Sequence, residues 1–384
     1  MQDAHTDNSL KLQRPSSRHG AFQVWAALPG RSSVAVLAEH YRFPPSLTGK
    51  GECIGILAFG GGARYSELVR FFERETGIVP ELRFKNSSPA NQSNRNSHHD
   101  AETMLDIQVA GALAPGARIV TYFADNHENG WIDGLSRAIH DEENRPSVLS
   151  ISWGATEDWW KLKTIQTLNE LFETAAGLGI TICAASGDDG CGTDLDGHCR
   201  VTFPASSPFV LACGGTASTP VNGEVVWNVK NASASGGGIS DRVPRPNWQP
   251  KFNEVFSSRL PSRRDPAFDG RQLPDVSGPA GYSYNVYVNG IYRNSVGGTS
   301  AVAPLWSALI ARLNEGLRSR GLPPLGHFHP RLYRERSIQQ TFHRIIAGHN
   351  DPFGNKGYQA GPGWNFCSGW GSPDGVKLLE ALSC

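Results

Sequence analysis

Short runs of β-branched residues alternate with longer amphipathic stretches through much of this chain. The runs that indicate strands are CIGILAF, ARIVTYFA, SVLSISWG, ITICAAS and FVLACGG. Between them, YSELVRFFERE, AETMLDIQVAGAL and KTIQTLNELFETAAGLG carry apolar residues at spacings of three and four, as amphipathic helices do. The pattern predicts an α/β fold with a doubly wound, mainly parallel sheet and helices on both faces.

Composition narrows the classes of partner. With 39% hydrophobic residues, a chain of 384 residues can bury a substantial core. Lys plus Arg and Asp plus Glu number 36 each, so charge gives no reason to expect nucleic acid or an anionic membrane as partner. No stretch approaches the roughly 18 apolar residues of a membrane span, and the first residues lack the apolar core of a signal peptide. We expect a soluble monomer.

Polarity along the chain suggests its organisation. Residues 1–33 are polar and rich in Pro, Ser and Gly, so we interpret them as an extension with little structure of its own. Residues 34–384 are expected to form a single domain. In the C-terminal third, dense Gly and Pro with interspersed aromatic residues predict long loops packed on the main sheet.

The seven cysteines form no metal-type CxxC pair. Only Cys191 and Cys199, close together in a Gly/Asp-rich loop, look able to form a disulfide. An odd number of cysteines leaves at least one free thiol, so the cysteines do not decide between a reducing and an oxidising compartment.

The segment VGGTSAVAPLWSALIARLNEGL places Ser300 at the start of a helix. There its hydroxyl can project into a cleft, where backbone N–H groups and the helix dipole favour negative charge on a bound carbonyl oxygen. The alternative is a plain helix N-cap, which is a common role for serine.

Glu102 and Asp106, in AETMLDIQVAGAL, are four residues apart and so share one helix face. Buried together, two carboxyls share protons and work as an acid/base unit in acid. The alternative is a solvated acidic face, but Met104, Leu105 and Ile107 leave little of the helix for solvent.

Asp188 and Asp189 follow the strand ITICAAS in a Gly-flanked turn. The carboxyl ends of parallel strands are where α/β sheets place their sites. A protonated aspartate there can donate a hydrogen bond to an oxyanion. An Asx turn and a metal-binding loop are the alternatives.

Together these segments resemble one family, the sedolisins, or serine-carboxyl peptidases, and most closely its kumamolisin-like bacterial branch. The family's motifs appear in the family's order as ETMLD, SGD and GTSAVAP. Further similarity lies in SVLSISWG, FPASSPFVLACGGT, GGGIS, LPDVSG and YQAGPGWNFCSGWGSP, from about Val34 to near the C-terminus. The resemblance implies a subtilisin-like fold.

The resemblance also implies roles for particular residues. Ser300 would attack the scissile carbonyl, Glu102 would accept its proton, and Asp106 would orient Glu102. Asp188, protonated, would stabilise the tetrahedral intermediate. The arrangement corresponds to a serine-protease catalytic triad in which a glutamate replaces the histidine base. Because a carboxyl base has a low pKa, such an enzyme can work in acid.

The walls of the substrate cleft are less defined. We expect them to come from Trp153, from the loop after Asp188 and from the glycine turn Gly236, Gly237 and Gly238. The aromatic surroundings favour an apolar cleft.

The chain departs from the family at its calcium site. Relatives usually bind one calcium near the C-terminus through two aspartates and several backbone carbonyls, but this chain has Arg344 and Asn365 at the aspartate positions. Calcium needs oxygen ligands, so we predict no metal and no cofactor. We expect the Arg344 guanidinium to take the cation's place and to donate to carbonyls such as those of Gly361 and Gly363.

Two further departures lie near the acid residues. Ala58 stands where close relatives have a glutamate that extends the acid network, and Asp189 stands where serine is common. Both changes bear on the pH optimum, or on the chemistry itself.

The leading hypothesis is an acid-favoured endopeptidase that cleaves protein or peptide substrates through a serine acyl-enzyme. The alternative is a peptide-binding or peptide-modifying homologue without general proteolytic activity. A Ser/His/Asp peptidase that recruits His98 or His99 is another alternative, but its order of residues would be unusual, and His99 is more simply a surface residue at the end of a polar loop. A metal hydrolase that uses these histidines, Asp100 and the Asp-rich loop after Cys191 is the last alternative, and no HExxH-like spacing supports it.

Relatives are made with a large N-terminal prosegment and often with an export signal, neither of which this sequence contains. We expect a cytoplasmic location if Met1 is the native start and an extracytoplasmic one if this is a processed form.

Overall fold

The structure, a computed structural model, describes residues 33–86, 97–191, 198–219, 223–252, 265–354 and 357–384. The strands of its largest sheet are β1 (Cys53–Phe59), β2 (Glu81–Asn86), β3 (Arg118–Ala124), β4 (Val148–Ile151), β6 (Thr181–Ala185), β8 (Val210–Thr219), β9 (Gly223–Val226) and β14 (Val276–Gly278). The helices are α1 (Ala35–His40), α2 (Tyr65–Glu75), α3 (Ser97–Leu113), α4 (Glu128–Ile139), α5 (Leu162–Gly177), α6 (Val302–Ser319), α7 (His329–Arg334), α8 (Arg336–Gln339) and α9 (Gly375–Leu382).

Shorter helical turns and two-stranded pairs lie outside the large sheet and its helices. Two 3-10 turns are η1 (Glu157–Trp159) and η2 (Thr299–Ala301). Antiparallel pairs join β5 (Ala155–Thr156) to β7 (Thr202–Phe203), β10 (Asn228–Val229) to β11 (Ser233–Ala234), β12 (Gly238–Pro244) to β13 (Gly270–Leu273), β15 (Tyr284–Val288) to β16 (Ile291–Val296) and β17 (Phe342–His343) to β18 (Ser372–Pro373).

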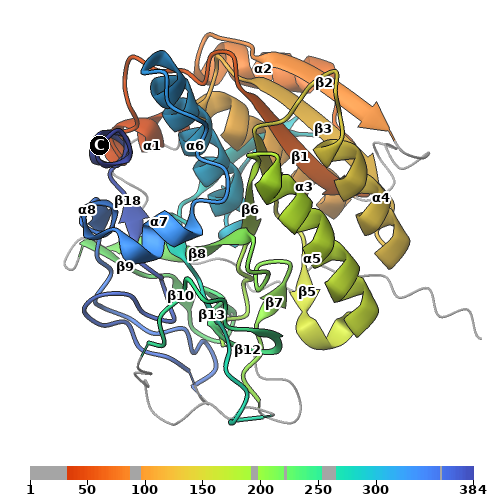
Figure 1. Cartoon of the computed structure of the whole chain (residues 1–384). Coiled ribbons are helices and arrows are strands. Elements are labelled where there is room, and N and C mark those ends of the chain that lie inside the picture. Colours follow the sequence, from red (N-terminus) through yellow and green to blue (C-terminus); the bar gives the residue numbers. More distant parts are fainter. Residues whose placement is uncertain (1–32, 87–96, 192–197, 220–222, 253–264, 355–356) are drawn as a thin grey trace, which may run out of the picture.

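The large sheet has the strand order β14-β8-β6-β4-β1-β3-β2, and all neighbours along this path are parallel. β9 pairs with the far end of β8 in the antiparallel sense. Figure 1 shows this sheet at the centre of the molecule, with helices around it. The predicted fold class is confirmed.

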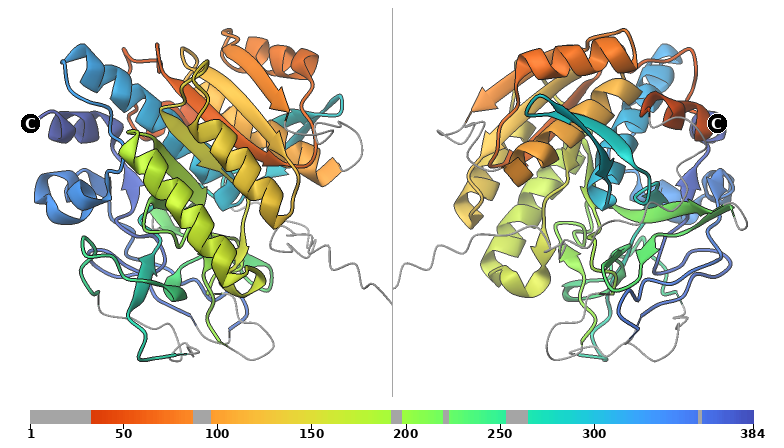
Figure 2. Two further views of the ribbon diagram at one scale, coloured as in Figure 1. Left: turned by 45° about the vertical axis from the view of Figure 1, so that its right-hand side comes forward. Right: turned by 180° about the vertical axis from the view of Figure 1, so that it is seen from behind.

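Side chains of the strands alternate between two cores. Along β1, Ile54 and Ile56 join the core that contains α3 and α6, whereas Leu57 and Phe59 join the core that contains α4 and α5. In the left view of Figure 2, α4 and α5 lie side by side on one face of the sheet, and α3 and α6 pack against each other on the other face. A strand buried on both faces has to be apolar throughout, which explains the continuous run CIGILAF.

The carboxyl edge of the sheet gathers the segments of the predicted site. β4 and β6 are neighbours, and they end at Ile151 and Ala185, just before Ser152 and Gly187. η2 contacts the end of β6, and α6 then runs back across β6, β4 and β8. Three segments that are distant in the sequence therefore meet at one edge.

The strands predicted from the five runs are confirmed to within a few residues. The prediction extended too far at SVLSISWG, because its last three residues leave β4 and turn into the site. The prediction of long loops in the C-terminal third was wrong in part: β14 belongs to the main sheet, β15 and β16 form a hairpin, and α7, α8 and α9 lie there as well.

The polar extension predicted for residues 1–33 falls almost entirely outside the described residues. Within the part of the chain that the structure describes, none of the helices is both long and apolar enough to cross a membrane.

Candidate active site

Ser300 lies in η2, at the point where this turn leads into α6. It is not the N-cap of α6, a position that Ala301 takes, and its hydroxyl instead donates to the carbonyl oxygen of Ser152 at 3.4 Å. Ser300 is 4% exposed and lines a pocket. The alternative of a plain N-cap serine therefore does not describe this residue.

The glycine before Thr299 is needed by the backbone. Gly298 has a φ of 113°, where side chains are disfavoured, and a Cβ on it would lie 2.5 Å from Oδ2 of Asp188. Gly298 thus allows the carboxyl of Asp188 to lie directly against the turn that carries Ser300.

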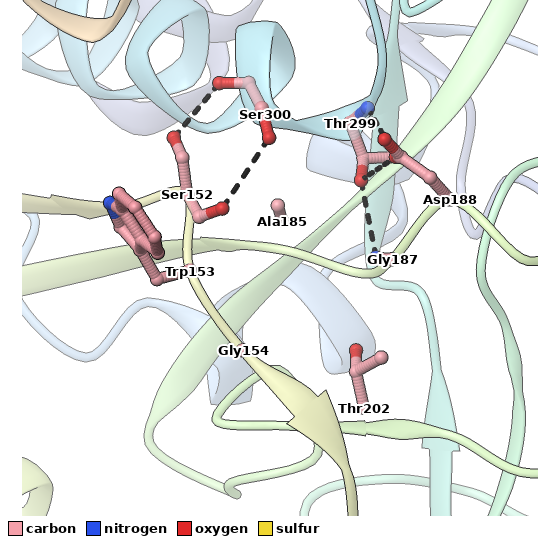
Figure 3. Close-up of a pocket in the computed structure, with 9 residues that line it drawn as sticks. All are labelled: Ser152, Trp153, Gly154, Ala185, Gly187, Asp188, Thr202, Thr299 and Ser300. Carbon is pink, nitrogen blue, oxygen red and sulfur yellow. Dashed lines mark hydrogen bonds between the residues drawn. The ribbon is translucent and has the colours of Figure 1, made fainter. Parts of the chain in front are cut away.

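Asp188 is held by that same turn. Its Oδ1 accepts hydrogen bonds from the backbone N–H of Thr299 at 2.8 Å and from the Thr299 hydroxyl at 2.7 Å. The Thr299 oxygen in turn accepts from the backbone N–H of Gly187 at 3.1 Å. Figure 3 shows this chain of contacts at one side of the pocket and Ser300 beside it. Both donors belong to Thr299, and both go to Oδ1 of Asp188.

Glu102 and Asp106 are buried inside α3, at 3% and 0% exposure. A solvated acidic helix face is therefore excluded. α3 packs against η2, so both carboxyls belong to the helix that backs the Ser300 turn. The two carboxyls are four residues apart in the sequence of α3, so they lie on the same side of the helix.

Ser152 connects Asp106 to the Ser300 turn. The hydroxyl of Ser152 donates to Oδ1 of Asp106 at 2.6 Å and lies 2.9 Å from the carbonyl oxygen of Ser300. Together with the bond from the Ser300 hydroxyl to the Ser152 carbonyl, these contacts tie the end of β4 to η2 (Figure 3). Ser152 was not among the predicted site residues, although a serine directly after a buried strand at the carboxyl edge of the sheet was a signal.

A pocket that is open to solvent lies beside Ser300. Its lining comes from the ends of β4 and β6, from β7 and from η2, and consists of Ser152, Trp153, Gly154, Ala185, Gly187, Asp188, Thr202, Thr299 and Ser300. No histidine is among these lining residues.

Trp153 forms a wall of the pocket, as predicted for a cleft residue. Its ring meets those of Phe59 and His99 edge-on, with centroid distances of 6.2 and 5.1 Å. His99 is therefore a neighbour of Trp153 but is not one of the lining residues, and His98 is exposed.

The glycine turn Gly236–Gly238 lies behind the pocket rather than in its lining. Gly236 N–H donates to the Gly187 carbonyl at 2.8 Å, and a Cβ on Gly236 would lie 2.1 Å from the Ser186 carbonyl oxygen. These glycines let one backbone approach another closely, which supports the turn that carries Asp188. Asp189, next along that turn, forms an isolated parallel bridge with Ala234 and is not a lining residue.

Arg344 does not occupy the position predicted for it. Its Nη2 donates to the carbonyl oxygen of Gln339 at 2.8 Å, and its guanidinium lies 4.6 Å from the centroid of the Trp370 ring. The side-chain amide of Asn365, rather than Arg344, approaches the Gly361 carbonyl. The prediction was wrong because Trp370 offers the guanidinium an aromatic face that the sequence pattern did not reveal.

Cys191 and Cys199 form a disulfide, in line with their proximity in the sequence. Cys199 Sγ is among the atoms nearest to a Cβ built on Gly238, so the disulfide braces the glycine turn. Among the described residues, Cys53, Cys183, Cys213, Cys367 and Cys384 are free thiols.

Comparison with known proteins agrees with this geometry. The sequence profile of the subtilase family (peptidase S8) matches residues 87–371. Kumamolisin from Bacillus sp. (strain MN-32) is 42% identical over 97% of this chain and 67% of its own length.

This chain belongs to the sedolisin family, in its kumamolisin-like branch.

Other sedolisin relatives agree in fold and sequence. Human tripeptidyl-peptidase 1 is 32% identical over 73% of the chain. The structure of Pseudomonas sedolisin, a serine-carboxyl proteinase complexed with two molecules of pseudo-iodotyrostatin, matches with a TM-score of 0.76 and 28% identity over 91% of this chain and 97% of that one. The chain spans 67% of the length of kumamolisin and 51% of that of tripeptidyl-peptidase 1.

Proposed function

We propose that this sedolisin is an acid-favoured endopeptidase that hydrolyses peptide bonds through an acyl-enzyme on Ser300. The observation that supports it best is one pocket in which Ser300 and Asp188 meet, with Asp106 joined to the Ser300 turn through Ser152. Family membership supports the same reaction class.

In the first step, Ser300 Oγ bonds to the scissile carbonyl carbon while its proton passes to the carboxylate of Glu102. The electron pair of the C=O bond moves to its oxygen. Asp188, protonated on Oδ2, donates a hydrogen bond to this oxyanion. This role fits Asp188 because its Oδ1 is already held by two donors from Thr299.

The intermediate then collapses with loss of the amine. The C–N bond breaks, and the nitrogen leaves with the proton that Glu102 received. Water attacks the acyl carbon, gives a proton to Glu102 and releases the acid, after which Ser300 regains its proton.

Asp106 acts on Glu102, one helical turn before it, by sharing the proton and fixing the orientation of that carboxyl. Ser152 is the described contact that fixes Asp106, through its 2.6 Å hydrogen bond. A carboxyl base accounts for activity in acid, where a histidine base would be protonated and inactive.

The pocket receives an apolar side chain of the substrate. The indole of Trp153 supplies an apolar wall. The hydroxyl of Thr202 donates to the carbonyl oxygen of Ser186 at 2.7 Å, so its hydrogen is not directed to the substrate. Apart from the Asp188 carboxyl, which serves the oxyanion, none of the lining residues carries an ionisable group that could pair with a charged side chain of the substrate.

A second candidate is a peptide-binding or peptide-modifying homologue. The observation behind it is Ala58, which is fully buried on β1 and brings no carboxyl to the acid network. Such a protein would bind peptides in the pocket without cleaving unfolded proteins in general.

Cleavage of an unfolded protein from acidic to neutral pH tests the proposal, with Ser300→Ala and Glu102→Ala as variants. We expect acid-optimal cleavage that is lost in both variants. Folded wild type that cleaves nothing at any pH would favour the second candidate, and activity that requires neutral pH would point to a histidine base instead.

A further inference from the structure

Two segments near the C-terminus run side by side in the region where family members hold calcium. β17 pairs with β18, so that His343 lies opposite Ser372. Just beyond this pairing, Arg344 contacts Trp370 and Ile345 contacts Asn365. The loop that would surround a metal ion is thus closed by contacts between neighbouring side chains and backbone.

The orientation of the Asn365 amide follows from its partners. Its Oδ1 accepts from the backbone N–H groups of Cys367 at 3.0 Å and of Ser368 at 3.1 Å, and from the Ser368 hydroxyl at 3.1 Å. Backbone N–H groups can only donate, so the atom that faces them has to be the oxygen. The nitrogen of this amide must therefore point to the other side.

On that other side, the nitrogen meets carbonyl oxygens. Nδ2 of Asn365 donates to the Ile345 carbonyl at 3.1 Å and approaches the Gly361 carbonyl at 3.5 Å. Backbone carbonyls of this kind are what calcium would bind, and here N–H hydrogens face them. Asn365 is buried, so these carbonyls are shielded from solvent by the amide.

This arrangement does not fit calcium. The cation takes six to eight oxygen ligands, with carboxylates contributing most of the charge, whereas Asn365 presents a donor and keeps its oxygen engaged elsewhere. Within the described ranges, no group of three or more His, Cys, Asp and Glu side chains is arranged to hold a metal ion.

Arg344 adds a positive charge to the same loop. Its guanidinium is half-buried over the Trp370 ring and donates to the Gln339 carbonyl, and burial lowers the pKa of this group. Arginine nevertheless stays protonated, so its charge would repel a second cation close by. The cation–π contact fixes the position of that charge.

We infer that this chain has replaced the family's calcium ion with an internal clamp, in which the Asn365 amide takes over the carbonyls while Arg344, held on the Trp370 ring beside Ile345, adds a fixed positive charge to the loop. The clamp joins residues 344–345 to residues 361–370, and the fold of this region is independent of calcium. The inference concerns the stability of the chain and does not depend on the proposed peptidase activity.

Calcium binding and thermal unfolding test this inference. Every protein used in these measurements also carries Ser300→Ala, so that self-cleavage does not distort the melting curves. After dialysis against a chelator, calcium is titrated by calorimetry, and Tm is compared in calcium and in chelator. We expect no stoichiometric binding and equal Tm values. Stoichiometric binding, or a Tm that falls in chelator, would overturn the inference.

Substitutions within the clamp test its two parts. Asn365→Ala removes the amide and is expected to lower Tm by about 1–4 °C equally in calcium and in chelator. The double variant Arg344→Asp with Asn365→Asp restores two carboxylates, and its Tm should be low in chelator and should rise when calcium is added.

The matched control is Arg344→Ala with Asn365→Ala, which loses the same donors without gaining carboxylates, and its Tm should not respond to calcium. An unchanged Tm in Asn365→Ala would contradict the role of the amide. Lack of a calcium response in the double aspartate variant would contradict the assignment of this loop as the calcium position. If that variant cannot be purified, the calcium titration of the parent chain decides alone.

Discussion

The hydroxyl of Ser152 contacts two parts of the buried site at once. It donates to Asp106 and lies against the Ser300 carbonyl, so it fixes an acid residue relative to the turn that carries the nucleophile. We regard Ser152 as a positioning residue.

Replacing Ser152 with alanine should lower kcat and leave KM within about twofold. A hydrogen bond to a charged group contributes about 1.5–3 kcal/mol, so the expected loss in kcat is about tenfold to a hundredfold. Steady-state kinetics on a peptide substrate in acid would measure both constants.

The matched control for this variant is Ser150→Ala. Ser150 is also fully buried, two residues earlier on β4, and its hydroxyl has no hydrogen-bond partner among the described residues. It should keep kcat close to wild type. Equal effects of the two substitutions would contradict a positioning role for Ser152.

At the scale of elements, a buried polar cluster joins β8, α7 and the start of β14. Asp275 accepts from Arg271 Nη2 and from the Ala212 N–H, both at 2.7 Å, and from the Tyr333 hydroxyl at 2.6 Å. Arg271 and Asp275 are both fully buried. Burial alone would raise the pKa of Asp275, but the guanidinium of Arg271 and the imidazole of His329 hold it well below its usual range.

Asp275→Ala should destabilise the fold by about 3–5 kcal/mol, because it leaves Arg271 as an unpaired buried charge. Urea denaturation of the Ser300→Ala chain would measure the loss. Tyr333→Phe removes one hydrogen bond to the same charged carboxylate and should cost about 1.5–3 kcal/mol. A loss below about 1 kcal/mol for Asp275→Ala would contradict this account.

The elements show what local pattern can and cannot predict. Strands such as CIGILAF were predictable because burial on both faces requires uninterrupted apolar residues. Ser300, Glu102 and Asp188 stood out because each lies in a motif of neighbouring residues. Ser152, Asp275 and the amide of Asn365 depend on partners distant in the sequence, and no local spacing encodes such pairs. The cation–π contact of Arg344 was missed for the same reason.

For the molecule as a whole, histidine burial opposes stability in acid. Burial, followed by the charge of the neighbouring His329, lowers the pKa of His327 from 6.5 to about 4. As pH falls from 6.5 to about 4, the unfolded chain therefore takes up a proton there that the folded chain does not. The contribution of His327 to stability is complete above pH 6.5 and is lost by about pH 4. Asp275 stays ionised across this window and loses its contribution only at lower pH.

His327→Gln should reduce the acid sensitivity of the fold. Glutamine keeps a donor for the Pro208 carbonyl, which His327 Nε2 contacts at 3.1 Å, but it does not titrate. In the Ser300→Ala background, the fall in Tm between pH 6.5 and pH 4 should become smaller by a few degrees. His343→Gln, at an exposed position, should leave that fall unchanged. A fall equal to that of the parent chain in His327→Gln would contradict the prediction.

Covalent attack by Ser300 is the central claim, and it can be observed directly with a peptide aldehyde that carries ¹³C at its carbonyl carbon. In acid, the aldehyde carbon should become tetrahedral in the NMR spectrum, because Ser300 Oγ adds to it and forms a hemiacetal beside Asp188. In Ser300→Ala, the hemiacetal signal should be absent, leaving only the signals of the aldehyde and its hydrate. A hemiacetal signal in Ser300→Ala, or no hemiacetal with a wild-type chain that binds the aldehyde and cleaves peptides, would contradict it.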